Sequence, residues 1–205
     1  MRSKSDLVNA IRGSQSNRLS DRVQHLVNTI GGSTKVTSLL DIGCGDGTIT
    51  AEIAMVFKIG TVYGADVQPD HPIPQLTHYY QVINNQINLP DHSIDLITCF
   101  MSIHHFEQFE PMMNEICRLL KPIGIFFFRE HDVPANNHQL IQQLNEKHRQ
   151  FPDHSGPIHY WSRAHLREIL TQRYHFVHMA DSDYPPHMHN KQAIYHSSYQ
   201  YSNFN

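Results

Sequence analysis

The sequence has 205 residues, 40% of them hydrophobic and 17% charged, and its formal net charge is −3 when the 17 histidines are counted as neutral. This length suffices for one α/β domain, and the slightly acidic balance argues against a surface that binds nucleic acid over its whole area. The cysteines are three in number and form no CxxC pair, the N-terminus carries no apolar leader, and no apolar run is long enough to span a membrane. We therefore expect a cytoplasmic protein without disulfides and without contact to a membrane.

The first elements in chain order are an arm and a helix. Residues 1–16 are polar and include Arg2, Lys4 and Arg12, so we expect a mobile arm. Residues 17–30 place apolar side chains at helical spacing, and Gly31–Gly32 favours the end of that helix. Further helices are predicted at 48–58, 108–120, 136–150 and 162–171. Strands are predicted at 36–42, 61–66, 78–83, 94–100, 123–129, 174–180 and 193–200.

The order of these elements predicts the fold class. Strands that alternate with helices form a parallel sheet with right-handed crossovers. No helix separates the last two strands, so they are expected to form an antiparallel pair at one edge. The prediction is a single α/β domain over residues 1–205, with a Rossmann-like, seven-stranded, mostly parallel sheet. Its tail, residues 202–205, is expected to be frayed.

The stretch LLDIGCGDGTIT, residues 39–50, carries the main functional signal. Gly43 and Gly45 follow a strand and precede a helix, the position at which a parallel sheet binds ligands. The carboxylates of Asp41 and Asp46 flank this turn and disfavour a phosphate, but they suit a ligand that carries an ammonium and a sulfonium. Asp66 ends the second strand, where a carboxylate can accept hydrogen bonds from both hydroxyls of a ribose.

These motifs resemble those of class I S-adenosylmethionine (SAM)-dependent methyltransferases. The matching segments are LLDIGCGDGTIT, VYGADVQ, LPDHSIDLITCFMSIHHF and EICRLLKPIGIFFFRE, and the resemblance covers about residues 36 to 180. It implies that SAM is the cofactor and S-adenosylhomocysteine the product. The resemblance also implies a cofactor site formed by Asp41, Gly43, Cys44, Gly45, Asp66, Val67, Asn85, Phe100 and Met101. Asn85 stands where the family has an acid that contacts the adenine amino group.

The acceptor is sought in the segment after the fourth strand. Residues 99–102 read Cys-Phe-Met-Ser, so the Asn-Pro-Pro-Tyr type of motif for exocyclic amines is absent, as is the Asp of the ribose 2′-hydroxyl tetrad. CFMSIHHFE, 99–107, resembles the corresponding segment of messenger-RNA cap guanine-N7 methyltransferases, including viral ones. Capped RNA is thus the favoured acceptor, in the host cytoplasm if the protein is viral. Guanine N7 carries no proton, so positioning alone supports that transfer.

The predicted acceptor site has no obligatory acid or base. The groups expected to orient the acceptor are His104, His105, Glu130 and His131. The groups expected to bind it are His104, His105, Arg129, Glu130 and Tyr160, with the basic arm near a cap triphosphate. Residues 129–132 equally fit a buried salt-bridged cluster, and Trp161 fits an anchor for the following helix.

Two other functions stay open at this stage. The chain also fits a small-molecule O- or N-methyltransferase, in which His105 acts as general base, or a non-catalytic module that binds a partner. No metal is predicted, because the His-x-His at 187–189 and the histidine within 153–155 lack further spaced ligands. The sequence gives no oligomeric state.

Overall fold

The computed structural model describes residues 17–30, 35–69, 76–150, 156–183 and 194–202. The predicted arm and the His-x-His at 187–189 lie outside these residues, as does the histidine within 153–155. The described helices are α2 (Asn17–Ile30), α3 (Thr48–Phe57), α4 (Phe109–Leu119), α5 (His138–His148) and α6 (Arg163–Arg173). The strands are β1 (Ser38–Ile42), β2 (Thr61–Asp66), β3 (His78–Gln81), β4 (Ile94–Phe100), β5 (Leu120–His131), β6 (Phe176–Asp183) and β7 (Ile194–Tyr201).

The seven strands form one sheet in the order β3-β2-β1-β4-β5-β7-β6. The first five strands of this order, from β3 to β5, run parallel to one another. Strand β7 pairs antiparallel with both β5 and β6. This confirms the predicted Rossmann-like α/β fold and its antiparallel final pair. The same sheet topology brings the carboxyl ends of β1, β2, β4 and β5 to one side of the domain. Ligands bind beyond these carboxyl ends in such sheets.

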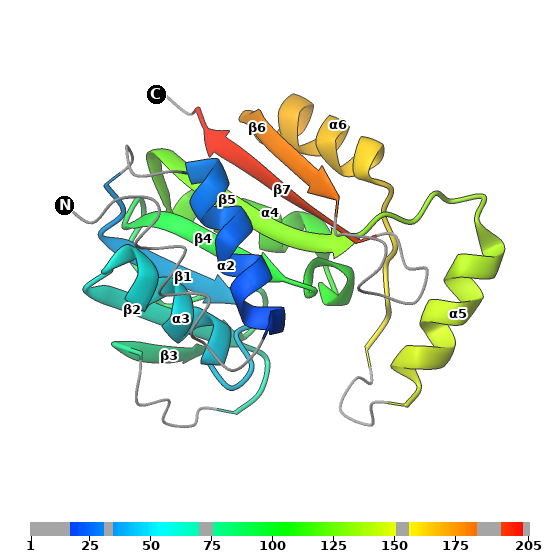
Figure 1. Cartoon of the computed structure of the whole chain (residues 1–205), viewed down its shortest axis with the longest axis horizontal. Helices are drawn as coiled ribbons and strands as arrows, with labels where there is room; N and C mark the ends of the chain where they lie inside the picture. Colours follow the sequence, from blue (N-terminus) through cyan, green and yellow to red (C-terminus); the bar gives the residue numbers. More distant parts are fainter. Residues whose placement is uncertain (1–16, 31–34, 70–75, 151–155, 184–193, 203–205) are drawn as a thin grey trace.

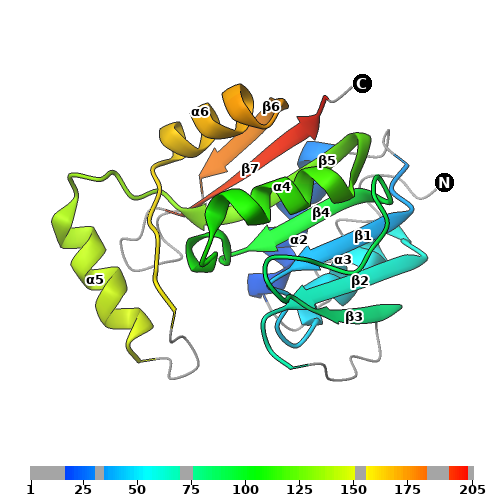
Figure 2. The same ribbon diagram turned by 180° about the vertical axis from the view of Figure 1, so that it is seen from behind.

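Helices cover both faces of the sheet (Figures 1 and 2). Helices α2 and α3 lie on one face, and their buried residues Val23, Leu26, Ile53 and Val56 share a core with Phe127. Helices α4 and α6 lie on the other face, in a core that includes Ile116, Leu166 and Leu170. All five residues of β1 are buried, which is typical of a strand covered on both faces. Among the described helices, none combines the length and the apolar character that a membrane crossing requires.

Several element boundaries differ from the predicted ones, among them those of β3 and β5. Strand β3 ends at Gln81 because the chain then turns through Asn84 and Asn85, which both have left-handed backbone. Strand β5 begins at Leu120, directly after α4, and continues to His131. The tail prediction is wrong for Ser202, because its backbone N–H and hydroxyl both donate to the His175 carbonyl, at 3.1 and 2.6 Å.

Helix α5 lies apart from the sheet in an excursion between β5 and α6 (Figure 1). The two ends of this excursion are held together, since Val133 N–H donates to the Trp161 carbonyl at 3.0 Å. Leu140 and Leu144 of α5 form a small core of their own with Val133. The side chain of Asn137 caps the helix by accepting from the Leu140 N–H at 3.1 Å.

Asp95 ties three strands of the sheet together at the edge opposite to the ligand edge. Its carboxylate accepts from Thr37 N–H and hydroxyl at 2.9 and 2.6 Å, from Ser38 N–H at 3.0 Å and from Lys121 Nζ at 2.7 Å. Burial alone raises the pKa of this carboxyl, but the bonds from Lys121, Thr37 and Ser38 outweigh it and hold the pKa well below its ordinary value.

We expect Asp95→Ala to lower the free energy of unfolding by about 2–3 kcal/mol, because several donors lose a charged acceptor. Urea unfolding at pH 7 measures this. Since the folded-state pKa is depressed, the contribution is complete above the unfolded-state pKa and falls as the pH drops below it. The control is Asp91→Ala, whose exposed pair with Arg118 is expected to contribute less than about 1 kcal/mol. Equal losses in the two variants would contradict the prediction.

Candidate active site

The glycine-rich loop joins the carboxyl end of β1 to the first turn of α3. Gly43 and Gly45 have φ angles of 72° and 53°, a left-handed conformation that favours glycine. Gly43 N–H donates to the Ala65 carbonyl of β2 at 2.7 Å. A Cβ added at Gly43 would lie 2.1 Å from the Ser102 hydroxyl, whereas one at Gly45 would meet no atom within 4 Å. The loop is therefore packed against the segment after β4 at Gly43 and is open at Gly45.

Asp66 ends β2 beside this loop. Its Oδ2 accepts from Gly45 N–H at 2.9 Å, and its Oδ1 is 3.3 Å from the donating Gln68 N–H. Val67, the next residue, is 69% exposed. Asn85 follows β3, the strand that pairs with β2, and is half-buried. Asp66 thus contacts the loop, whereas Asn85 lies in the turn after β3, where its Nδ2 is 3.4 Å from Gln108 Oε1.

Two residues predicted to contact the cofactor lie beneath the loop. Asp41 is buried, and its carboxylate accepts from the hydroxyls of Thr50 and Thr98 at 2.5 and 2.7 Å. These bonds fix the end of β1 to α3 and β4. Phe100 is also buried, with its ring centroid 5.8 Å from that of Phe127. Met101 follows with a left-handed backbone, and its N–H donates to the Arg129 carbonyl at 2.8 Å.

A buried carboxylate–imidazole pair lies at the end of β5. Glu130 is 1% exposed and accepts from His104 Nδ1 at 2.7 Å, from His104 N–H at 3.2 Å and from His131 N–H at 2.7 Å. Burial alone raises the pKa of Glu130, but the charge and hydrogen bond of His104 outweigh it and lower that pKa. Burial also lowers the pKa of His131 to about 4, so this imidazole is neutral at pH 7.

The position of Arg129 and Glu130 differs from the prediction that they bind the acceptor. Both are buried, with 2% and 1% of their surfaces exposed. The cause is β7, which pairs with β5 to its last residue and places His196 opposite Arg129 and Tyr195 opposite Glu130. The cluster thus lies inside the sheet, as in the structural alternative that the sequence left open.

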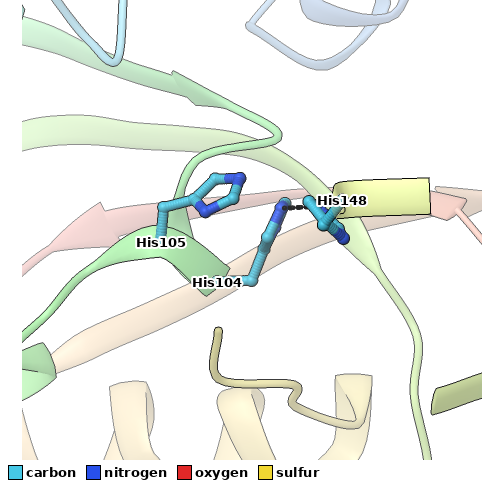
Figure 3. A group of neighbouring side chains, drawn as sticks. All are labelled: His104, His105 and His148. Carbon is cyan, nitrogen blue, oxygen red and sulfur yellow. Dashed lines mark hydrogen bonds between the residues drawn. The ribbon is translucent and has the colours of Figure 1, made fainter. Parts of the chain in front are cut away.

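His104, His105, His148 and Tyr160 meet beyond the end of β4. His104 and His105 belong to the short 3₁₀ helix Ile103–His105, and His148 is the last residue of α5. Their side chains gather in Figure 3, where His104 and His148 point toward one another. The Tyr160 hydroxyl donates to Asn145 Oδ1 at 3.0 Å, and the Tyr160 ring stacks on His104 with centroids 6.3 Å apart. Burial, with Glu130 as the second cause, raises the pKa of Tyr160 to about 12.

Comparison with known proteins decides the family. Residues 14–177 match the family described as methyltransferase domain. The chain belongs to the methyltransferase family. It is 27% identical over 125 residues to the fatty-acid O-methyltransferase of Mycolicibacterium smegmatis, a match that covers 53% of this chain and 45% of that protein. It is 31% identical over 100 residues to the sterol 24-C-methyltransferase of Yarrowia lipolytica, covering 43% of this chain and 26% of that protein.

The fold of this methyltransferase is shared with solved structures. Geranyl diphosphate C-methyltransferase of Streptomyces coelicolor A3(2), solved with magnesium, geranyl diphosphate and S-adenosylhomocysteine, superimposes with a TM-score of 0.70 at 13% identity. The superposition covers 96% of this chain and 84% of that one. The chain spans less than half the length of the two curated relatives named above.

Two site residues of the methyltransferase were missed from the sequence. Ser102 touches the glycine loop, and His148 reaches the end of β4 from α5, although it lies 44 positions after His104 in the sequence. No local motif marks either residue, because both act through contacts between distant segments. Trp161, in contrast, lies where the sequence suggested, with its ring stacked on His165 of α6 at a centroid distance of 5.6 Å and tilted against Phe109 at 4.7 Å.

The cysteines of the methyltransferase are all free. Burial raises the pKa values of Cys44 and Cys99 well above the ordinary value, with nearby carboxylates adding to the effect. Burial raises the pKa of Cys117 to about 12. All three thiols therefore stay protonated near pH 7, which is unfavourable for a nucleophilic cysteine.

Proposed function

We propose that the protein transfers the methyl group of SAM to a hydroxyl, carboxyl or amine group of a small organic molecule. Family membership supports the transfer, and the glycine loop with Asp66 supports SAM as the donor. The relatives named above support a small acceptor by their names, which refer to a fatty acid, a sterol and geranyl diphosphate. The small-molecule alternative from the sequence thus replaces cap guanine as the favoured acceptor.

One observation carries this choice: Arg129 and Glu130 are buried and the imidazole of His105 is not. A site that recognises guanine needs charged groups that face the ligand. Arg129 and Glu130 were expected in that role, but both are buried where β5 pairs with β7. His105 is half-buried and lies three residues after Ser102, which touches Gly43 of the loop. The turn that packs against the loop thus carries a partly exposed imidazole, which suits removal of a proton from an acceptor.

The proposed reaction is a direct in-line displacement. The acceptor oxygen or nitrogen forms a bond to the methyl carbon while the bond from that carbon to the sulfonium sulfur breaks, which leaves S-adenosylhomocysteine. His105 accepts the proton that the acceptor loses. The glycine loop and the turn at Ile103–His105 hold the two reactants from opposite sides, and this positioning supplies much of the rate.

The experiment is a transfer assay with radiolabelled SAM. A panel of fatty acids, sterols, isoprenoid alcohols, phenols and small amines is offered beside unmethylated capped RNA. Label in an organic extract, lost in His105→Ala and retained in His165→Ala, supports the proposal. His165 is a matched control because it lies on α6 and stacks on Trp161. Label in 7-methylguanosine alone would overturn the small-molecule proposal.

We expect Asp66→Ala to weaken SAM binding by about 1.5–3 kcal/mol, the effect of losing hydrogen bonds to a charged group. The same substitution removes the acceptor for Gly45 N–H, so the loop also loses a support. Isothermal titration calorimetry with SAM and with S-adenosylhomocysteine measures the change. Asp91→Ala removes an exposed carboxylate that pairs with Arg118 and is not part of the loop, and it serves as the control with an expected unchanged affinity. A similar affinity for wild type and Asp66→Ala would contradict the assignment of Asp66 to the ribose.

A further inference from the structure

Three histidines from two distant segments converge beyond the end of β4 (Figure 3). His104 and His105 come from the turn after β4, and His148 comes from the end of α5. One ring nitrogen from each lies within 4.8 Å of the others. Within this group, His104 Nε2 and His148 Nε2 are 3.2 Å apart.

The hydrogen-bond partner of His104 fixes its tautomer. Nδ1 of this imidazole lies 2.7 Å from Glu130 Oε1, and the two oxygens of this carboxylate also accept from the backbone N–H groups of His131 and His104. An ionised carboxylate only accepts hydrogen bonds, hence Nδ1 carries a hydrogen. In the neutral ring, Nε2 then presents a lone pair.

The surroundings of His148 lead to the same tautomer. Its Nδ1 lies 2.9 Å from the Leu144 carbonyl, which only accepts hydrogen bonds. The Tyr160 hydroxyl lies 3.2 Å from the same nitrogen and already donates its proton to Asn145. Nδ1 of His148 therefore donates, and its Nε2 also presents a lone pair.

Two lone pairs that face one another at 3.2 Å repel each other unless a cation lies between them. Two nitrogen ligands of a tetrahedral zinc ion, each with a bond of about 2.0–2.1 Å, are about 3.3–3.4 Å apart. The separation of the two Nε2 atoms is close to this value. A shared proton is the competing cation, and it would bridge these two nitrogens alone, whereas a metal ion can also take a ring nitrogen of His105 as a ligand.

We propose that His104 Nε2, His148 Nε2 and a ring nitrogen of His105 bind a divalent transition-metal ion, with zinc as the probe. Glu130 behind His104, and the Leu144 carbonyl behind His148, supply the hydrogen bonds that orient metal-bound imidazoles. The negative charge of Glu130 offsets part of the charge of the ion. Three protein ligands leave a fourth position open.

A second group, His104, Glu130 and His131, also has ligand atoms within 4.8 Å of one another. In that arrangement the metal would compete with the hydrogen bond between His104 Nδ1 and Glu130. The set with His148 keeps this bond and uses Nε2 of His104 instead. The geometry therefore favours the three-histidine set. The sequence predicted no metal, because its ligands are brought together by α5 and not by a local motif.

Metal binding has two consequences for the methyltransferase. It joins α5, which lies apart from the sheet, to the turn that follows β4 (Figure 1). It also occupies the lone pair of His105, so zinc is expected to lower methyl transfer to an acceptor that must lose a proton. This second consequence rests on the proposed function, whereas metal binding itself does not.

The test uses the full chain, freed of metal with a chelator and then titrated with zinc by calorimetry at pH 7.5. We expect one strong site in the wild type and in the His165→Ala control. His148→Ala and His105→Ala are each expected to weaken that site by about 100-fold or more. With cobalt, the wild type should show the visible absorption of tetrahedral coordination, and His148→Ala should not.

Thermal unfolding of each variant without zinc shows whether it folds, so a lost site can be distinguished from a lost fold. Equal zinc affinity in wild type, His148→Ala and His105→Ala would overturn the proposal, as would the absence of a strong site in the folded wild type. The latter result would assign the space between the two Nε2 atoms to a proton. Strong zinc binding without any effect on methyl transfer would instead contradict the role of His105 as base and would leave the metal site standing.

Discussion

Gly43→Ala is expected to weaken the binding of SAM and S-adenosylhomocysteine by about 100-fold or more, which corresponds to about 2.7 kcal/mol. Two effects add. The backbone at Gly43 has a φ of 72°, where an alanine is strained. The new methyl group would also lie 2.1 Å from the Ser102 hydroxyl and 2.6 Å from its Cβ, so the loop or the turn after β4 must move. Calorimetric titration with both ligands measures the loss.

A double variant separates the two effects. Ser102→Gly removes the atoms that the new methyl group meets, so Gly43→Ala combined with Ser102→Gly is expected to recover part of the affinity and to retain only the backbone strain. Gly60→Ala, at a position with no atom within 4 Å of the added Cβ, is the control for alanine itself. If Gly43→Ala bound both ligands as the wild type does, the loop would not be the cofactor site.

Glu130→Ala is expected to lower the free energy of unfolding by about 3–5 kcal/mol, the scale for removal of one partner from a buried polar pair. The substitution leaves His104 Nδ1 and the backbone N–H groups of His104 and His131 without their acceptor inside the sheet. Urea unfolding at pH 7 measures the loss. Glu146→Ala, which removes an exposed carboxylate paired with Arg149, is expected to cost less than about 0.5 kcal/mol.

The pH dependence gives an independent check on Glu130. Its pKa in the folded protein lies below the ordinary value of 4.5, so its contribution is complete above that pH and declines as the pH falls further. The difference in stability between wild type and Glu130→Ala should therefore shrink below pH 4.5. A difference that stays constant with pH would show that the loss comes from the empty volume and not from the charge.

The sheet and the cofactor loop were predictable because their signals are local. Apolar runs alternate with helical stretches, and the conformation of Gly43 and Gly45 is one that glycine adopts most readily. The spacing to Asp66 follows from the length of one strand–helix–strand unit. The absence of a helix between the last two strands likewise sufficed for the antiparallel edge.

The acceptor side was not predictable to the same degree. Charges at a strand end usually face water, so Arg129 and Glu130 were expected at the mouth of the site. Their burial depends on β7, which begins more than 60 residues later and pairs with β5 to its last residue. The position of His148 also depends on a contact between distant segments, since only the path of α5 brings it to His104.

The hydrogen bonds that join the two ends of the segment containing α5 have an evolutionary consequence. Val133 and Trp161 close the loop by a main-chain bond, and a second bond from Arg163 N–H to Asp132 Oδ1, at 2.9 Å, lies beside it. Because the segment leaves and re-enters the domain at one point, its length and composition can drift while strand register stays intact. Residues 134–160 are thus a segment that can be exchanged between related proteins. We expect that exchange of this stretch for the equivalent one of a relative leaves the sheet and the glycine loop folded.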